Sequence, residues 1–256
     1  MSDFRRPAAV LLDFGGVLVQ GRPRESAYQE VAAEIDALLT RACGESPGLG
    51  QVEADLRAAM RAWRDWKNAQ SRRARPREIS HREFWEDFVA ADWPLAARSV
   101  VVAHASDLCQ RVDLAMQERT PTDGALELLQ RLAALGIRTG CVSNALAGSG
   151  SRILMRQYGF EAHLGVQIYS DEVGVRKPNP EIFELATTAL NVSPAECWYV
   201  GDKRDRDVLG ARRAGIARVI LMPSGDSDQG PLVTADPDHV IQSPLQLLDL
   251  LCSERS

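Results

Sequence analysis

Four short segments of the sequence contain side chains that can attack, bind or neutralise an anionic group. Carboxylates act as nucleophiles or bind hard metal ions, hydroxyl and N–H groups bind anions, and lysine neutralises charge. Taken singly, each segment also has an ordinary explanation, such as a turn, a helix cap, a surface cation or acids at a helix start. In chain order the candidates are Asp13 with Gly15 and Gly16, then Ser143 and Asn144, then Lys177, and finally Asp202 and Asp207.

The predicted secondary structure places these four segments at one edge of a sheet. Helical patterns separate nearly all of the apolar runs, and this alternation predicts an α/β fold, a Rossmann-like, doubly wound parallel sheet with helices on both faces. Ligands bind at the carboxyl ends of the strands in such sheets, which is where the four segments lie. The apolar runs typical of strands are residues 8–12, 137–142, 197–200 and 216–222, with weaker ones at 164–169 and 239–241.

More than 100 residues separate the first predicted strand from the second, and this stretch has a helical pattern. We predict a core formed by residues 1–20 and 117–256, and an inserted α-helical cap formed by residues 21–116. The basic run at residues 71–77 is expected to be a solvated loop, and Lys67 is expected on a solvated helix face. The helices predicted in the cap are residues 27–39, 52–66, 81–89 and 96–114.

Composition and charge exclude several classes of protein. The 256 residues are 45% hydrophobic and 25% charged with a net charge of −5, which gives no electrostatic footprint for nucleic acid. The five cysteines form no CxxC pair, which favours a reducing cytoplasm over a disulfide framework or a zinc site. The first apolar run is too short for a signal peptide or a membrane span. We expect a cytoplasmic monomer or homodimer without a membrane or nucleic-acid partner.

The order and spacing of the four segments resemble the haloacid dehalogenase (HAD) superfamily over residues 7–20 and 117–243. The resemblance implies a hydrolase, most simply a Mg²⁺-dependent phosphatase that cleaves a small phosphorylated metabolite through an aspartyl-phosphate intermediate. Lys203, which follows the first aspartate of the last segment, has no role in the resemblance. The resemblance implies that Asp13 is the nucleophile and that Lys177 compensates its charge. It implies that the metal is bound by Asp13, the Gly15 carbonyl and Asp202, with Asp207 as a third or outer ligand. The implied phosphate ligands are the turn amides around Gly16, together with Ser143, Asn144 and Lys177.

The sequence departs from most phosphatases of the superfamily at Gly15, where they have a second aspartate that protonates the leaving group. Such assistance is worth ~10²–10⁴-fold, so we expect a preference for good leaving groups. A cap residue such as His81, His104 or an acid is an alternative proton source. Gly15→Asp is expected to raise activity on alkyl phosphates, and the absence of a gain would indicate an acid in the cap.

Three alternative functions stay open at this point. A haloacid dehalogenase needs no metal and usually lacks the pair formed by Gly201 and Asp202. A phosphonate hydrolase also lacks the second aspartate but requires a cap lysine, and Lys67 is the only lysine in that region. A catalytically weak member would bind a phosphorylated ligand or a protein, although the spacing of Trp63 and Trp66 favours packing over an interface.

Overall fold

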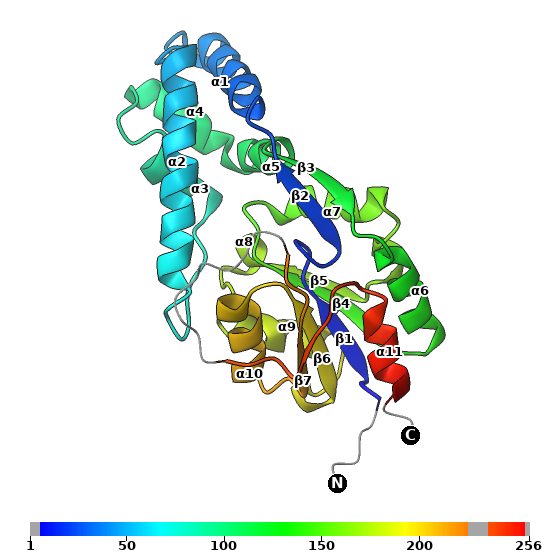
Figure 1. Ribbon diagram of the computed structural model, residues 1–256. Coiled ribbons are helices and arrows are strands. Elements are labelled where there is room, and N and C mark those ends of the chain that lie inside the picture. The colour runs from blue at the N-terminus through cyan, green and yellow to red at the C-terminus, as the bar shows by residue number, and fades with distance from the viewer. Residues whose placement is uncertain (1–5, 225–234, 254–256) are drawn as a thin grey trace.

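The computed structural model describes residues 6–224 and 235–253, and its centre is a six-stranded parallel sheet (Figure 1). Side chains of the first strand alternate between the two faces: Val10 and Leu12 pack on one face, and Ala9 and Leu11 on the other. All four are fully buried, which explains the continuous apolar run. In spatial order the strands are β5 (Val166–Tyr169), β4 (Arg138–Ser143), β1 (Ala9–Leu12), β6 (Cys197–Gly201), β7 (Arg218–Leu221) and β8 (His239–Val240).

Helices cover both faces of the sheet, so the predicted doubly wound architecture is confirmed. The face of Val10 and Leu12 packs against α6 (Ala125–Ala134), α7 (Gly148–Gln157) and α11 (Gln246–Ser253). The opposite face packs against α9 (Glu181–Ala189) and α10 (Leu209–Arg213). The other helical segments of this part of the chain are short: η2 (Glu161–His163), α8 (Ser170–Val173), η3 (Pro194–Glu196) and η4 (Arg204–Val208).

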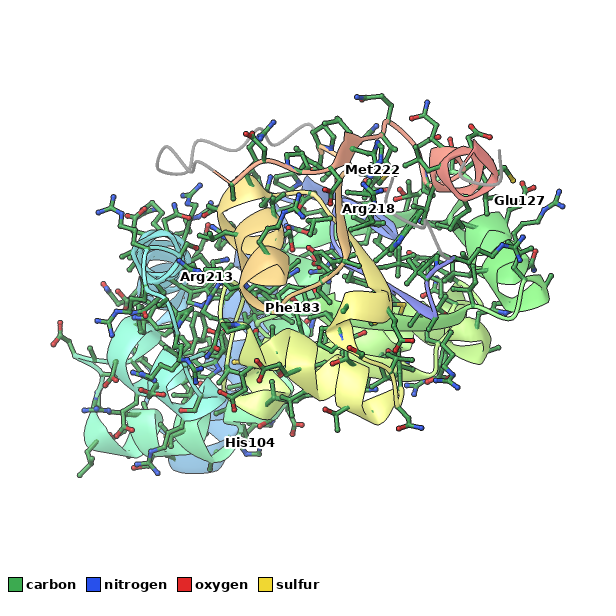
Figure 2. The ribbon with its side chains drawn as sticks, turned by 90° about the horizontal axis from the view of Figure 1, so that it is seen from below. His104, Glu127, Phe183, Arg213, Arg218 and Met222 are labelled. Atoms are coloured by element: carbon green, nitrogen blue, oxygen red, sulfur yellow. The ribbon has the colours of Figure 1, made fainter. Side chains whose placement is uncertain are left out.

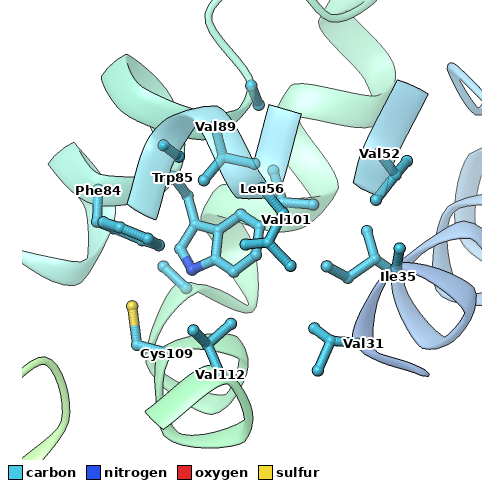
Figure 3. Packing of buried hydrophobic residues seen from close by; sticks show 14 of the residues in the cluster. Val31, Ile35, Val52, Leu56, Phe84, Trp85, Val89, Val101, Cys109 and Val112 are labelled. Atoms are coloured by element: carbon cyan, nitrogen blue, oxygen red, sulfur yellow. The ribbon is translucent and has the colours of Figure 1, made fainter. Parts of the chain in front are cut away.

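The helices within residues 27–115 form a separate apolar core, and we refer to them as the helical insertion. Trp85 lies at its centre (Figure 3), and Phe84 packs edge-on against both Trp85 and Trp63. The aromatic side chains therefore fill a core, as their spacing predicted. The helix predicted at 96–114 is divided at His104 into two. The elements are α1 (Ala27–Cys43), α2 (Leu49–Gln70), α3 (His81–Glu83), η1 (Phe84–Val89), α4 (Leu95–Ala103) and α5 (Ala105–Ala115).

A two-stranded antiparallel ribbon carries the chain into and out of the helical insertion. It consists of β2 (Val19–Pro23) and β3 (Gln117–Pro121), paired from Val19 opposite Pro121 to Pro23 opposite Gln117. Most of its residues are exposed, so it has neither the apolar run nor the alternation of a buried strand. The ribbon was therefore not predicted from the sequence.

A second contact joins the insertion to the core through residues 71–79. Residues 72–75 are exposed as predicted, but Ser71 and Pro76 are buried, so the segment is not simply a solvated loop. Arg213 lies on the side of the core that faces the insertion (Figure 2), and its NH1 donates to Arg73 O at 3.1 Å. Two further residues anchor the segment: Glu78 accepts two hydrogen bonds from Arg176 NH1 at 2.8 and 3.0 Å, and both side chains are buried.

All five cysteines are free. Within residues 6–224 and 235–253, every helix is too short or too polar to cross a bilayer.

Candidate active site

The carboxyl ends of three adjacent strands bring the four segments together. Leu12, the last residue of β1, is paired with Cys141 of β4 on one side and Val200 of β6 on the other. The chain therefore leaves all three strands at the same edge, beside a cavity of about 690 Å³. Residues of the core and of the helical insertion both line this cavity. All eight residues predicted for the site line it: Asp13, Gly15, Gly16, Ser143, Asn144, Lys177, Asp202 and Asp207.

Lys177 is the centre of the charge network beneath the cavity. Its Nζ lies 2.9 Å from Asp13 Oδ2 and 2.6 Å from Asp207 Oδ1, and it donates to Val142 O at 3.0 Å and contacts Tyr199 Oη at 2.9 Å. The side chain is only 2% exposed. Burial alone would lower the pKa of Lys177, but the two carboxylates raise it above its usual range. The ammonium is therefore a fixed positive charge beside Asp13.

The pKa values of Asp13 and Asp207, which both contact this lysine, are shifted in opposite directions. Burial, opposed by Lys177 and supported by the charge of Asp207, raises the pKa of Asp13. Burial also penalises ionised Asp207, but Lys177 and the hydrogen bond from Tyr199 lower its pKa below the usual value. These directions favour the ionised form of Asp207 more strongly than that of Asp13.

Asp202 lies beside this charge network, and its partners neutralise its negative charge less completely. Its Oδ2 accepts a hydrogen bond from Ser224 Oγ at 2.6 Å and lies 3.4 Å from Lys203 Nζ. Burial, followed by the charges of Asp207 and Asp13, raises the pKa of Asp202 to about 7. A cation added here would be favoured because it reduces the repulsion among three acids.

The three carboxylates fit a hard divalent cation. One oxygen from each of Asp13, Asp202 and Asp207 lies within 4.8 Å of the others, and an all-oxygen donor set is what such cations prefer. Both oxygens of Asp207 are engaged by protein donors: Tyr199 Oη and Lys177 on Oδ1, and the N–H groups of Asp202 and Lys203 on Oδ2. These bonds favour Asp13 and Asp202 as the direct ligands and Asp207 as an outer one.

Two of the predicted phosphate ligands, Gly16 and Asn144, form hydrogen bonds within the protein instead. Gly16 N–H donates to Val19 O at 2.8 Å, so it is not available to a phosphate oxygen. Gly16 matters instead for its backbone: φ is +77°, and a Cβ there would lie 2.6 Å from Asp202 Oδ2. Asn144 also has another role, since its side-chain amide bonds both the N–H and the C=O of Lys177 and so positions that lysine. Ser143 keeps a hydroxyl that lines the cavity beside Asp13.

The two histidines that the sequence suggested as proton donors line a different cavity from the one that contains Asp13. A Cβ built on Gly15 meets no heavy atom within 4 Å, so there is open space next to this backbone position. His81 and His104 line another cavity, and His81 contacts Asp171 Oδ2 at 3.2 Å. Lys67 was expected on a solvated face but is half-buried and lines the main cavity, because α2 places its last turns against the core.

Two contributors to the site were not predicted from sequence. Tyr199 donates its phenolic hydrogen to Asp207 at 2.6 Å and contacts Lys177, and Ser224 donates to Asp202. A tyrosine hydroxyl within the apolar run 197–200 was a usable signal, because a buried hydroxyl needs a partner. Ser224 follows β7 and had no local signal.

Curated relatives align with about half of this chain or less. The chain is 36% identical over 132 residues to a glyceraldehyde 3-phosphate phosphatase of Methanopyrus kandleri, covering 51% of this chain and 56% of that protein. It is 39% identical over 80 residues to a phosphoserine phosphatase of Thermus thermophilus, covering 31% of each. The first of these alignments thus spans about half the length of the relative.

Solved structures match over nearly the whole chain. CbbY from Rhodobacter sphaeroides, solved with phosphate, superposes with a TM-score of 0.58 at 19% identity over 94% of this chain and 96% of that one. A 2-haloacid dehalogenase from Pseudomonas syringae superposes with a TM-score of 0.62 at 18% identity over 96% and 98%. These likenesses concern the fold alone. A family profile described as haloacid dehalogenase-like hydrolase matches residues 7–215, and the chain belongs to that family.

Proposed function

We propose that this protein is a Mg²⁺-dependent phosphatase that hydrolyses a small phosphorylated metabolite through a phosphoryl intermediate on Asp13. The observation that carries the proposal is the ion pair of Asp13 with buried Lys177 at the base of a cavity that Asp202 and Asp207 also line. The relatives, which include glyceraldehyde 3-phosphate and phosphoserine phosphatases, support the reaction class. A cavity of about 690 Å³ suits a small molecule.

The chain's own residues supply most of the proposed chemistry. Asp13 attacks phosphorus, the bond from phosphorus to the ester oxygen breaks, and water later releases phosphate from Asp13. Lys177 and the Ser143 hydroxyl bind the equatorial oxygens of the transferred group, where negative charge must be stabilised. Mg²⁺ held by Asp13, the Gly15 carbonyl and Asp202, with Asp207 behind them, would neutralise phosphoryl charge.

We also propose that residues 21–116 act as a cap over this site, with the core formed by residues 1–20 and 117–256. Met60, Trp63 and Val112 of the helical insertion line the same cavity as Asp13. Excluding bulk water from phosphoryl transfer strengthens electrostatic interactions there, and the insertion's side chains would select the substrate.

A panel of phosphate esters tests the proposed function directly. With Mg²⁺ present, we expect release of inorganic phosphate from p-nitrophenyl phosphate and from at least one class among phosphorylated sugars, hydroxy acids and amino acids. The rate on a chlorinated acid is the control, because a dehalogenase would release chloride without added metal. Chloride release without phosphate release would refute the phosphatase assignment.

Magnesium is expected to raise the thermal midpoint by neutralising the three acids. At 100 times its Kd, a ligand adds about 2.7 kcal/mol, which corresponds to about 5–10 °C for a chain of this size. Because Asp202 has a pKa near 7, its proton must leave when metal binds, and the increase should be larger at pH 8 than at pH 6. Calorimetry of the wild type and of Asp202→Asn measures this. An equal increase in the variant would contradict the assignment.

The position of Lys67 also supports a second candidate, cleavage of a carbon–phosphorus bond after imine formation between the lysine and an aldehyde phosphonate. Lys67 lines the cavity that contains Asp13, as the imine-forming lysine of such an enzyme must. Borohydride in the presence of phosphonoacetaldehyde would reduce such an imine and leave a covalent adduct on Lys67. Phosphatase turnover without an adduct would favour the first candidate.

A further inference from the structure

The absence of an acid at Gly15 leaves the leaving group without an obvious proton donor from the core. In phosphoryl transfer, the attacking and leaving oxygens lie roughly in line on opposite sides of phosphorus. Asp13 lies at the end of β1, so the leaving oxygen faces the wall supplied by the helical insertion. The insertion residues on that wall are Met60, Trp63, Lys67, Val112, Asp113 and Met116.

Among the described residues of that wall, the two with an acidic or basic side chain are Asp113 and Lys67. Asp113 is held by Arg119, whose NH1 and NH2 donate to its two oxygens at 2.9 and 3.1 Å, so it is a paired carboxylate. The Lys67 ammonium lies 3.3 Å from the centroid of the Trp63 ring, which lines the same cavity. A ring face stabilises the cation without accepting its protons in strong hydrogen bonds.

We propose that Lys67 protonates the leaving group in the first step and deprotonates the attacking water in the second, replacing the acid missing at Gly15. This inference rests on the proposed phosphatase function. In the first step the electron pair of the broken bond stays on the ester oxygen, which takes a proton from Lys67 Nζ and leaves as an alcohol. In the second step, water bonds to phosphorus, its proton goes to Lys67, and the bond from Asp13 to phosphorus breaks.

The surroundings of Lys67 suit both steps. Burial, followed by the charges of Arg176 and Arg206, lowers the pKa of Lys67 well below its usual value, against the opposing charges of Glu78 and Asp113. Those four residues come from the core and from the segments of the insertion packed around α2. A lysine with a lowered pKa is a stronger acid than an ordinary ammonium, so it gives up its proton more readily.

Lys67→Met tests this role through the dependence of rate on the leaving group. We expect kcat on alkyl phosphates to fall by about 10²-fold or more and kcat on p-nitrophenyl phosphate to fall much less, because general acid catalysis is worth ~10²–10⁴-fold where the leaving group needs a proton. A plot of log kcat against leaving-group pKa should therefore become steeper. The wild type should lose alkyl activity as pH rises through the pKa of Lys67, and the variant should lack this decline.

Gly15→Asp provides a rescue in the same experiment. The open space at Gly15 can hold the new side chain, and we expect the double variant Gly15→Asp with Lys67→Met to recover at least about tenfold of the alkyl activity. In the wild-type background, the same change should give little gain. Arg64→Met, an exposed position on α2 that does not line the cavity, is the matched control and should leave both rates unchanged.

Several results would overturn the role of Lys67 without affecting the phosphatase proposal. An equal loss on all esters, or a rise in KM confined to substrates with a second anionic group, would make Lys67 a binding residue. Lack of rescue by Gly15→Asp with an unchanged slope would also refute it. A wild type inactive on every ester would instead refute the proposed function itself.

Discussion

Asp13→Asn is expected to abolish hydrolysis of every phosphate ester, with kcat reduced by ~10³-fold or more, as is typical when the nucleophile of a covalent mechanism is lost. The amide is nearly isosteric but cannot attack phosphorus. The substitution also removes one of two buried carboxylates that share Lys177, so it should not unfold the protein. Release of inorganic phosphate under saturating substrate and Mg²⁺ measures the effect.

The control for this variant is an Asp→Asn change elsewhere. Asp87 is exposed on the helical insertion and does not line the cavity, so Asp87→Asn should keep wild-type kcat. Hydrolysis by Asp13→Asn within about tenfold of the wild type would assign the nucleophile to another group.

Lys177→Met is expected to damage both activity and stability. It removes the cation that contacts Asp13 and Asp207 while keeping the length of the side chain. Removing one partner of a buried ion pair typically costs about 3–5 kcal/mol in the free energy of unfolding, and losing a charge that stabilises the transition state costs about 10²–10³-fold in kcat. Urea unfolding and phosphate release measure the two effects. Lys203→Met, a lysine that is 21% exposed, should cost much less stability.

The pH dependence of this stability loss follows from the pKa directions. Lys177 has a raised pKa in the folded protein, so its contribution is complete at neutral pH and is lost only as pH rises through that value. Asp207 has a lowered pKa, so its contribution is present above the unfolded pKa and is lost as pH falls. Without the cation, the two acids would be more stable protonated. The difference between wild type and Lys177→Met should therefore be larger at pH 8 than at pH 5, and a difference independent of pH would contradict the network.

Local patterns predicted the sheet and the convergence of the four segments, because both depend on short-range signals. The run at residues 8–12 is apolar since both faces of the sheet are covered, and Asp13 follows it directly. In the structure, the order β4-β1-β6 places Ser143 and Asp202 on either side of Asp13, at the edge that the sequence predicted.

Features that depend on the placement of one unit against another could not be predicted. The partners in the β2–β3 ribbon, such as Val19 and Pro121, are far apart in sequence and mostly exposed. Lys67 looked like a solvated residue because helical periodicity shows which face is polar but not whether that face meets the core. The bond from Gly16 N–H to Val19 O is likewise a property of a turn whose closing residue is not evident from the glycines.

Capture of the covalent intermediate on Asp13 tests the proposed mechanism most directly. Wild-type protein is mixed with p-nitrophenyl phosphate and Mg²⁺, quenched with acid within one turnover, digested and examined by peptide mass spectrometry. We expect a phosphoryl group on the wild-type peptide that contains Asp13 and no phosphoryl group on the same peptide of Asp13→Asn. A burst of p-nitrophenol with the phosphoryl group on another residue, or turnover by Asp13→Asn at the wild-type rate, would contradict it.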